Sequence, residues 1–225
     1  MNHKDIFSNI YKNCEWGNDK NEIYDGSSGF GSSLEMTEKL YIPFLQHFID
    51  SNKINSICDL GCGSSAYLKK FLNSLSNISY IGYDIYGDVI NFNNLYFKNN
   101  ANFDFITLDI LKQKNEIKKA DLFLIKDVFH HWSNNDIIQF MDYFIKNINY
   151  RYILITNSCD TLAVGSKDIA TGKFRPISVK NFPLSQFNAK IVLEWGNPEL
   201  FSDIEIDNKK IWIKYIFETS LIEKI

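Results

Sequence analysis

Residues 56–68 read Ser-Ile-Cys-Asp-Leu-Gly-Cys-Gly-Ser-Ser-Ala-Tyr-Leu, and this stretch decides the fold. It predicts a short apolar strand that carries one acidic residue, then a Gly-x-Gly turn, then the start of a helix. Gly61 and Gly63 let the backbone turn sharply and let a ligand approach it closely. The free N–H groups at the start of a helix favour a negatively charged or polar ligand group. A strand, a glycine turn and a helix in this order indicate the nucleotide-binding corner of a doubly wound α/β sheet.

The spacing of this turn is compatible with two kinds of nucleotide. Gly61-x-Gly63-x-x-Ala66 fits the dinucleotide fingerprint, which would indicate an NAD-dependent oxidoreductase. Asp59, just before the turn, favours another ligand, because its carboxylate would repel a pyrophosphate group. S-adenosylmethionine carries cationic ammonium and sulfonium groups and no phosphate, so it is compatible with Asp59. A turn that only joins a strand to a helix is the remaining alternative.

Three further apolar segments end in a carboxylate. The strand predicted at 79–84 ends in Asp84, about 20 residues past the turn, where an acidic residue accepts hydrogen bonds from ribose hydroxyls. The strand at 103–109 ends in Asp109, which is placed to accept a hydrogen bond from an adenine amino group. A fourth, at 121–127, is mostly apolar, which predicts burial on both faces. One strand-terminal aspartate is more often a turn former, but four in succession favour a ligand site at the carboxyl ends of the strands.

At these residues the chain resembles the class I S-adenosylmethionine-dependent methyltransferases, over roughly residues 50–220. The motifs are Asp59-Leu-Gly-Cys-Gly, Tyr83-Asp84, Leu108-Asp109 and Lys126-Asp127. Where the family often has a third glycine, this chain has Ser65. The resemblance implies that Asp59, Gly61 and Gly63 surround the methionine part, that Asp84 binds the ribose and that Asp109 binds the adenine amino group. It extends the cofactor-binding set to Leu108, Ile110 and Lys126.

The predicted architecture is a Rossmann-like, doubly wound α/β sheet of seven strands, mostly parallel with an antiparallel last strand. Residues 1–53 are expected to form an N-terminal helical cap with a Gly/Ser-rich loop, packed as one unit on a methyltransferase domain at 54–225. Pro43 predicts a kink or a delayed start in the helix at 34–50. The segment 157–188 is too long for an ordinary connection and is expected to lie over the carboxyl edge of the sheet. Further helices are predicted at 4–14, which has one apolar face, and at 65–75, 87–97 and 134–147, the last capped by Ser133. Further strands are predicted at 152–156, 190–195 and 210–217.

Three stretches resemble a narrower branch of the family, often encoded with bacterial capsule and O-antigen genes. They are Tyr24-Asp-Gly-Ser-Ser-Gly-Phe-Gly-Ser-Ser33, the segment 126–136, and 168–176 together with Phe182-Pro183. The branch implies a small-molecule acceptor that is a sugar, a nucleotide sugar or a phosphorylated or phosphoramidate intermediate of surface-polysaccharide synthesis. Lys126 stands where arginine is expected in much of this branch, and lysine lacks the bidentate fork of arginine.

Three residues of these stretches are candidates for the acceptor site. They are Tyr24, Trp132 and Arg175. Arg175 offers a fixed fork of donors to an anion or a sugar hydroxyl, and the alternative is an ion pair that holds the long loop. Trp132 either stacks on a sugar face or fills the edge of the core. The loop 26–33 either closes over the cofactor or only links two helices.

Methyl transfer to a hydroxyl group requires aligned reactants and the removal of a proton. His131 and Asp127 follow the fourth strand and are the candidate catalytic residues. Histidine has a reference pKa near neutrality, which suits a general base, and Asp127 would orient His131 or bind the acceptor hydroxyl. His130 is expected to be a bystander. The alternative is that one histidine packs beside Trp132 and the other is solvated; a metal site from two adjacent histidines is not expected.

Composition limits the other classes of function. The 225 residues carry a net charge of −3, and the basic residues cluster only in pairs such as Lys69-Lys70, so no nucleic-acid partner is predicted. The four cysteines lack Cys-x-x-Cys spacing, so neither a zinc site nor a disulfide framework is expected. With no apolar stretch long enough for a signal peptide or a membrane span, we expect a cytoplasmic protein without a membrane partner.

Two rival functions remain beside the oxidoreductase. A nucleic-acid amino-methyltransferase usually shows an Asp/Asn-Pro-Pro-aromatic motif after the fourth strand, and this chain reads Lys126-Asp-Val-Phe there. A non-catalytic cofactor-binding partner subunit is the other rival. All the acidic residues that are predicted to bind the cofactor are present, which argues against this rival. The sequence therefore predicts an enzyme that methylates an oxygen of a small polar acceptor.

Overall fold

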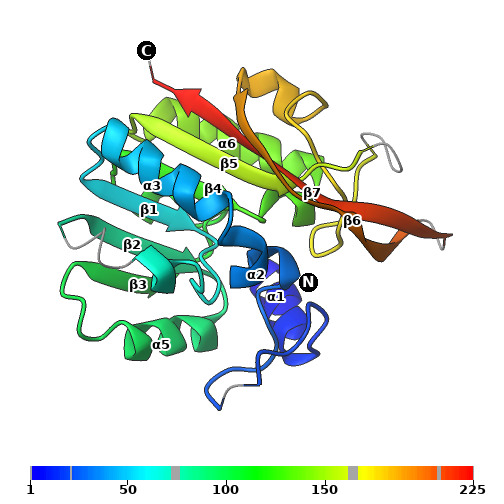
Figure 1. Ribbon diagram of the computed structural model, residues 1–225, viewed down its shortest axis with the longest axis horizontal. Helices are drawn as coiled ribbons and strands as arrows, with labels where there is room; N and C mark the ends of the chain where they lie inside the picture. The colour runs from blue at the N-terminus through cyan, green and yellow to red at the C-terminus, as the bar shows by residue number, and fades with distance from the viewer. Residues whose placement is uncertain (1, 21, 72–76, 162–166, 207–208, 225) are drawn as a thin grey trace.

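The computed structural model describes residues 2–20, 22–71, 77–161, 167–206 and 209–224, and it contains one mixed sheet covered by helices on both faces (Figure 1). The strand order is β3-β2-β1-β4-β5-β7-β6. The first five strands of this order are parallel, and β7 runs antiparallel to both β5 and β6. This confirms the predicted seven-stranded Rossmann-like sheet. The strands are β1 (Ser56–Leu60), β2 (Ser79–Asp84), β3 (Phe103–Thr107), β4 (Leu122–Lys126), β5 (Tyr152–Ser158), β6 (Lys190–Ile206) and β7 (Lys209–Glu223).

Two groups of helices cover the sheet. Buried side chains of α3 and α5 share one apolar cluster with β1 and β2, whereas those of α1 and α6 share a second cluster with β4 and β5. None of the described helices is both long and apolar enough to cross a membrane. The helices are α1 (His3–Lys12), α2 (Leu34–Thr37), α3 (Tyr41–Ser51), α4 (Leu68–Phe71), α5 (Gly87–Tyr96) and α6 (Asn134–Asn147).

The helix predicted at 34–50 is in fact two helices, α2 and α3. Pro43 is the third residue of α3. The first turn of a helix has no intrahelical partner for its N–H groups, so proline is tolerated there. The delayed start that proline predicted is confirmed. Of the helix predicted at 65–75, the structure describes α4, and residues 72–75 lie outside the described residues.

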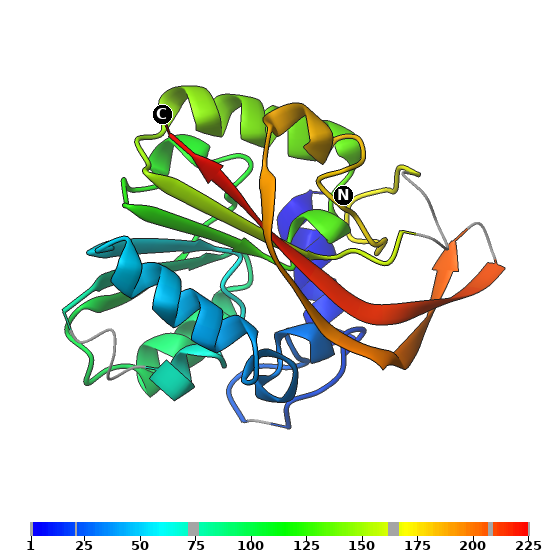
Figure 2. The same cartoon turned by 45° about the horizontal axis from the view of Figure 1, so that its top comes forward.

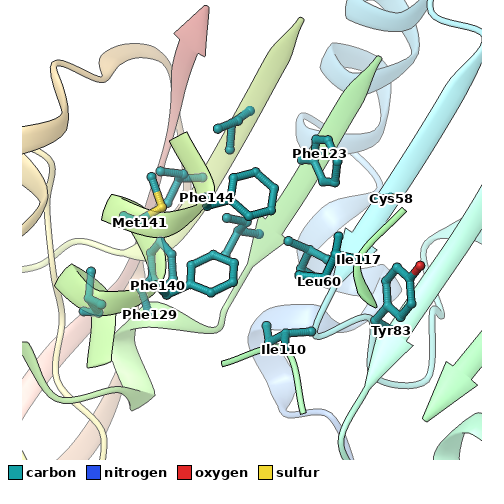
Figure 3. Packing of buried hydrophobic residues seen from close by; sticks show 14 of the residues in the cluster. Cys58, Leu60, Tyr83, Ile110, Ile117, Phe123, Phe129, Phe140, Met141 and Phe144 are labelled. Carbon is teal, nitrogen blue, oxygen red and sulfur yellow. The ribbon is translucent and has the colours of Figure 1, made fainter. Parts of the chain in front are cut away.

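The centre of the second cluster is a group of phenylalanines between α6 and the sheet (Figure 3). Phe123 of β4 packs edge-on against Phe144 at 4.8 Å between ring centroids, and Phe140 stacks on Phe144 at 5.2 Å. All three side chains are fully buried. The predicted cap of α6 is confirmed, since the Ser133 side chain accepts a hydrogen bond from the Asp136 N–H at 3.2 Å. This packing fixes α6 on β4.

The strands β6 and β7 are longer than predicted. β7 pairs with β5 as far as Phe217, opposite Ser158, and its residues 209–216 pair only with β6. The hairpin therefore extends beyond the carboxyl end of β5 (Figure 2). A register shift between Asn197 and Phe201 lets Pro198 lie within β6, because a bulge tolerates a residue without an N–H. The strand predicted at 190–195 stops just before Gly196 and Pro198, two residue types that commonly interrupt a strand.

Replacement of Gly82 by alanine should destabilise the fold by about 1–3 kcal/mol through overpacking. A Cβ at Gly82 in β2 would lie 2.7 Å from Phe105 Cδ1 and 2.9 Å from Cys62 Sγ. The control is Gly87→Ala at the start of α5, where the nearest atom would be 3.6 Å away. Urea unfolding measures both free energies. An equal loss in both variants would contradict this account of the packing between β2 and the glycine turn.

Candidate active site

The glycine turn between β1 and α4 is clamped to the end of β2. Gly61 and Gly63 have φ values of +80° and +53°, which favour glycine. The Gly61 N–H donates to the Tyr83 carbonyl at 2.8 Å, and the Gly63 N–H donates to Asp84 Oδ2 at 2.9 Å. A Cβ on Gly61 would lie 2.5 Å from Val128 Cγ2. The turn is therefore fixed between the segments that follow β2 and β4.

Asp59 lies buried behind this turn. The hydroxyls of Tyr67 and Tyr80 both donate to its Oδ2, the second at 2.8 Å. Burial raises the pKa of Asp59 to about 6, although the two hydroxyls partly oppose the shift. The structure thus places Asp59 at the turn and gives it two tyrosine partners that the sequence analysis did not anticipate.

Asp84 and Asp109 contact backbone N–H groups and also line a common cavity. Asp84 Oδ1 accepts from the Tyr86 N–H at 3.0 Å, and burial raises the pKa of Asp84. Asp109 Oδ1 accepts from the N–H groups of Leu111 and Lys112 at 3.2 and 3.1 Å. Each aspartate therefore forms a turn, as a strand-terminal aspartate commonly does. The turn role and the predicted ligand role are compatible, since both side chains border the cavity.

The first cavity lies at the carboxyl ends of β1, β2 and β4 and encloses about 890 Å³, its open mouth included. The cavity sits where the strand order reverses between β1 and β4, the usual position of a ligand in such a sheet. It brings together all eight residues predicted to bind the cofactor: Asp59, Gly61, Gly63, Asp84, Leu108, Asp109, Ile110 and Lys126.

The N-terminal segment supplies a wall of this cavity that the sequence analysis missed. Tyr11 of α1 stacks on Tyr86 at 4.5 Å between ring centroids, and its hydroxyl lies 3.0 Å from Ser28 Oγ. Ser28 Oγ also accepts from the Ser64 N–H at 2.9 Å. The loop 26–33 therefore contacts the glycine turn, which supports its role as a lid. The apolar stripe of α1 was the sequence signal that this helix packs on the domain.

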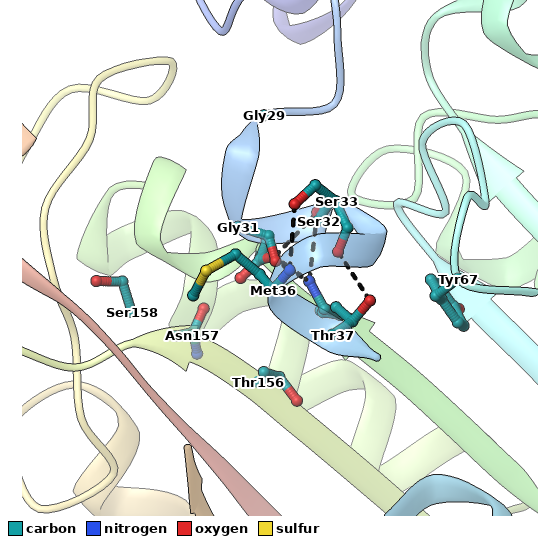
Figure 4. A network of polar contacts seen from close by, with 12 residues as sticks. Gly29, Gly31, Ser32, Ser33, Met36, Thr37, Tyr67, Thr156, Asn157 and Ser158 are labelled. Atoms are coloured by element: carbon teal, nitrogen blue, oxygen red, sulfur yellow. Dashed lines mark hydrogen bonds and ion pairs between the residues drawn. The ribbon is translucent and has the colours of Figure 1, made fainter. Parts of the chain in front are cut away.

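The end of the loop 26–33 leads into α2 (Figure 4). Ser33 caps α2, because its Oγ accepts from the Met36 N–H at 3.3 Å, and Thr37 Oγ1 donates to the Ser33 carbonyl at 2.8 Å. Thr37 is fully buried. The preceding residue, Ser32, donates to Asp127 Oδ2 at 3.0 Å. The lid is thus anchored directly to a candidate catalytic residue.

Asp127 follows β4 in a left-handed backbone conformation, with φ +58°. Its Oδ2 accepts from Lys126 Nζ and Ser32, whereas its Oδ1 is buried and has no hydrogen-bond partner among the described residues. Burial opposes ionisation, but the charge of Lys126 and these hydrogen bonds outweigh it and lower the pKa of Asp127. Strained backbone and an unpartnered buried acceptor are typical of a functional position.

The two adjacent histidines have opposite tautomers. His131 Nδ1 lies 3.1 Å from the Lys173 carbonyl, which can only accept, so Nδ1 carries the proton and Nε2 has a free lone pair. His130 Nδ1 accepts from the Ser158 N–H at 3.2 Å, so its proton lies on Nε2. Burial lowers the pKa of both residues, that of His131 to about 4. Both are buried, so the alternative with one solvated histidine is wrong.

A second cavity adjoins the first and shares five lining residues with it: Trp16, Ser28, Ser32, Asp127 and His131. The His131 ring stacks on Trp16 at 4.5 Å between centroids. Residues 172–174 of the long segment form another wall, which places that segment at the carboxyl edge as predicted. The extended hairpin forms another wall with residues 202–205 and with Ile213, Tyr215 and Phe217.

The predicted acceptor residues do not gather in this second cavity. Trp132 lines the first cavity and packs at 5.6 Å from both Phe129 and Phe140, which favours the core-filling alternative. Arg175 is 2% exposed, pairs with Asp168 at 3.1 Å and lines neither cavity. The structure thus supports the ion pair that holds the long loop. Tyr24 also lines neither cavity, and its hydroxyl donates to Asp19.

Comparisons with known proteins agree with this geometry. Residues 58–149 match the family described as a methyltransferase domain. Magnesium protoporphyrin IX methyltransferase from Synechocystis PCC 6803, solved with bound S-adenosylmethionine, aligns with a TM-score of 0.58 at 11% identity over 98% of this chain and 97% of that one. The N-methyltransferase NodS from Bradyrhizobium japonicum WM9, solved with S-adenosylhomocysteine, aligns with a TM-score of 0.57 at 11% identity over 97% of each chain. A search of curated proteins found no match. The chain has the class I methyltransferase fold.

His131→Gln should make the stability of the protein less sensitive to acid. Between pH 6.5 and 4 the unfolded chain binds a proton at this histidine that the folded chain, with its pKa of about 4, does not bind. Stability is therefore lost as the pH falls through this window, by about 2–3 kcal/mol between pH 7 and pH 4.5. Urea unfolding at pH 7 and pH 4.5 measures this loss of stability, which should be smaller in the variant because the contribution of His131 is missing. The same substitution at exposed His47 is the control, and a profile of His131→Gln equal to that of the control would contradict the burial of a neutral His131.

Proposed function

We propose that this protein transfers a methyl group from S-adenosylmethionine to an oxygen of a small polar acceptor. The observation that carries the proposal is the wall that the two cavities share at Asp127 and His131. A cofactor in the first cavity and an acceptor in the second would meet at these side chains. A non-catalytic cofactor-binding subunit would have no use for this second, adjoining cavity.

The residues of the first cavity suit this cofactor better than a dinucleotide. Its lining includes four carboxylates, those of Asp59, Asp84, Asp109 and Asp127, and one lysine. That lysine, Lys126, is paired with Asp127. A pyrophosphate would lie among carboxylates without a free lysine or arginine, whereas hydroxyl, amino and ammonium groups are donors to carboxylates. Bound S-adenosylmethionine supplies an electrophilic methyl group with a good leaving group.

The chain's own residues then orient the acceptor and accept its proton. The Asp127 carboxylate accepts a hydrogen bond from a second hydroxyl of the acceptor, and Lys126 keeps this carboxylate ionised. His131 Nε2 takes the proton of the reacting hydroxyl, and the Lys173 carbonyl holds the ring in the required tautomer. The lowered pKa makes His131 a weaker base but keeps it unprotonated at pH 7.

The acceptor belongs to surface-polysaccharide synthesis in this proposal, and the reaction is cytoplasmic. The support is the resemblance of residues 24–33, 126–136 and 168–183 to the branch encoded with capsule and O-antigen genes. That resemblance leaves open sugars, nucleotide sugars and phosphorylated or phosphoramidate intermediates. A fold by itself does not select a substrate, so the charge of the second cavity must discriminate among these acceptors.

The purified protein should bind S-adenosylmethionine and S-adenosylhomocysteine but not NAD. The physical reason is the carboxylate lining of the first cavity, which accepts hydrogen bonds from donors and repels a pyrophosphate. Isothermal titration calorimetry with each of the three compounds measures this directly. Binding of NAD alone would refute the proposed cofactor.

Asp84→Asn should weaken the binding of S-adenosylhomocysteine about 10- to 100-fold. A hydrogen bond between a carboxylate and a hydroxyl contributes about 1.5–3 kcal/mol. Asparagine keeps one side-chain oxygen, which can accept from one of the two backbone donors, the N–H groups of Gly63 and Tyr86, whereas alanine would leave both without an acceptor. The control is Asp88→Asn, on the exposed side of α5. Equal affinities in the two variants, measured by calorimetry, would remove Asp84 from the cofactor site.

A further inference from the structure

The second cavity is predominantly acidic. Its lining contains four carboxylates, those of Glu15, Asp127, Asp203 and Glu205, and one lysine, Lys173. Among the described residues, no ion pair involves Glu15, Asp203 or Glu205. Its two histidines are held neutral by burial. A negatively charged acceptor would therefore meet mostly like charge.

The other cations near this cavity are already engaged. Lys126 pairs with Asp127 and also donates to the Gly31 carbonyl at 3.2 Å. Arg175 is buried and donates to Asp168, to the Asn134 side chain and to the carbonyls of Lys167 and Trp132. Lys126 and Arg175 are therefore not available to a phosphate group. Lys210, the register partner of Glu205 in the hairpin, does not line the cavity.

Five aromatic rings line the cavity beside serine, glycine and isoleucine residues. The Asp127 carboxylate and His131 Nε2 can accept hydrogen bonds, and His130 Nε2–H can donate one. Aromatic rings suit a ligand with a flat apolar face, and the polar atoms suit hydroxyl groups. The rings of this cavity belong to Trp16, Phe30, Phe174, Tyr215 and Phe217.

We propose that the acceptor is an uncharged, hydroxyl-bearing molecule with one flat apolar face, an unphosphorylated sugar or glycoside, and that phosphorylated acceptors are excluded by the carboxylates. This inference rests on the proposed function, because it takes the second cavity as the acceptor site. The C–H face of the sugar lies on the aromatic rings, and two of the sugar hydroxyls donate to Asp127 and His131. This proposal excludes phosphorylated intermediates and nucleotide sugars as acceptors, which the sequence had left open.

The experiment compares two probes that share a phenyl ring and differ in charge, phenyl β-D-glucopyranoside and phenyl phosphate. Each is titrated at low salt into the protein, with and without saturating S-adenosylhomocysteine, and binding is followed by ligand-observed NMR. The glucoside should bind at least about tenfold more tightly than the phosphate. Equal binding, tighter binding of the phosphate, or binding of neither probe would overturn the acceptor assignment.

A charge-reversal variant tests whether the carboxylates cause the preference for the glucoside over the phosphate. The double variant Asp203→Lys/Glu205→Lys should raise the affinity for phenyl phosphate about tenfold and leave the affinity for the glucoside within twofold. Glu199→Lys is the matched control, since Glu199 is exposed on the same hairpin and does not line the cavity. An unchanged preference in the double variant would overturn the electrostatic cause.

The binding of S-adenosylhomocysteine is measured separately by calorimetry in the same samples. Its absence would refute the proposed cofactor, whereas its presence with the wrong preference between the probes would refute only the acceptor class. The two failures are therefore distinguishable.

Discussion

The buried ion pair between Lys126 and Asp127 is the interaction on which the site depends. The two side chains are 4% and 11% exposed, and Asp127 occupies a left-handed backbone conformation. Removing one partner of a buried pair costs about 3–5 kcal/mol, because the other charge is left uncompensated. Lys126 also contacts the Gly31 carbonyl and Ser32 Oγ, so the same pair fastens the lid to the end of β4. Oδ2 is satisfied in this way, whereas Oδ1 is buried without a hydrogen-bond partner among the described residues, and Asp127 lines both cavities.

The backbone around this pair determines the chemistry of the neighbouring histidines. The Lys173 carbonyl and the Ser158 N–H each contact one Nδ1 atom, and they impose opposite tautomers on His131 and His130. Both contacts come from segments far away in the sequence, the long loop and the end of β5. Burial then keeps the two rings neutral, so that a lone pair and an N–H donor coexist on adjacent residues. An acceptor with several hydroxyl groups matches this arrangement.

Much of the fold could be predicted because it is encoded locally. Runs of apolar residues predict buried parallel strands, and Gly61 and Gly63 predict a turn with positive φ. The same local logic placed the cap of α6 at Ser133. Prediction from local sequence failed where pairing with a distant segment overrides the local preference of the chain. Gly196 and Pro198 read as the end of a strand, yet β6 continues through them because a bulge against β7 accommodates them.

The sequence by itself determined the sheet, the glycine turn and the acidic residues at the strand ends, because neighbouring residues encode each of them and parallel strands bring their carboxyl ends together. Only the tertiary structure decided which side chains remain free for a ligand. Arg175, a predicted anion contact, pairs with Asp168, and Tyr24 contacts Asp19. Ser28 and Tyr11, which were not among the predicted site residues, line the first cavity. Charge complementarity and hydrogen bonding between segments separated by tens of residues set these roles, and no local pattern records them.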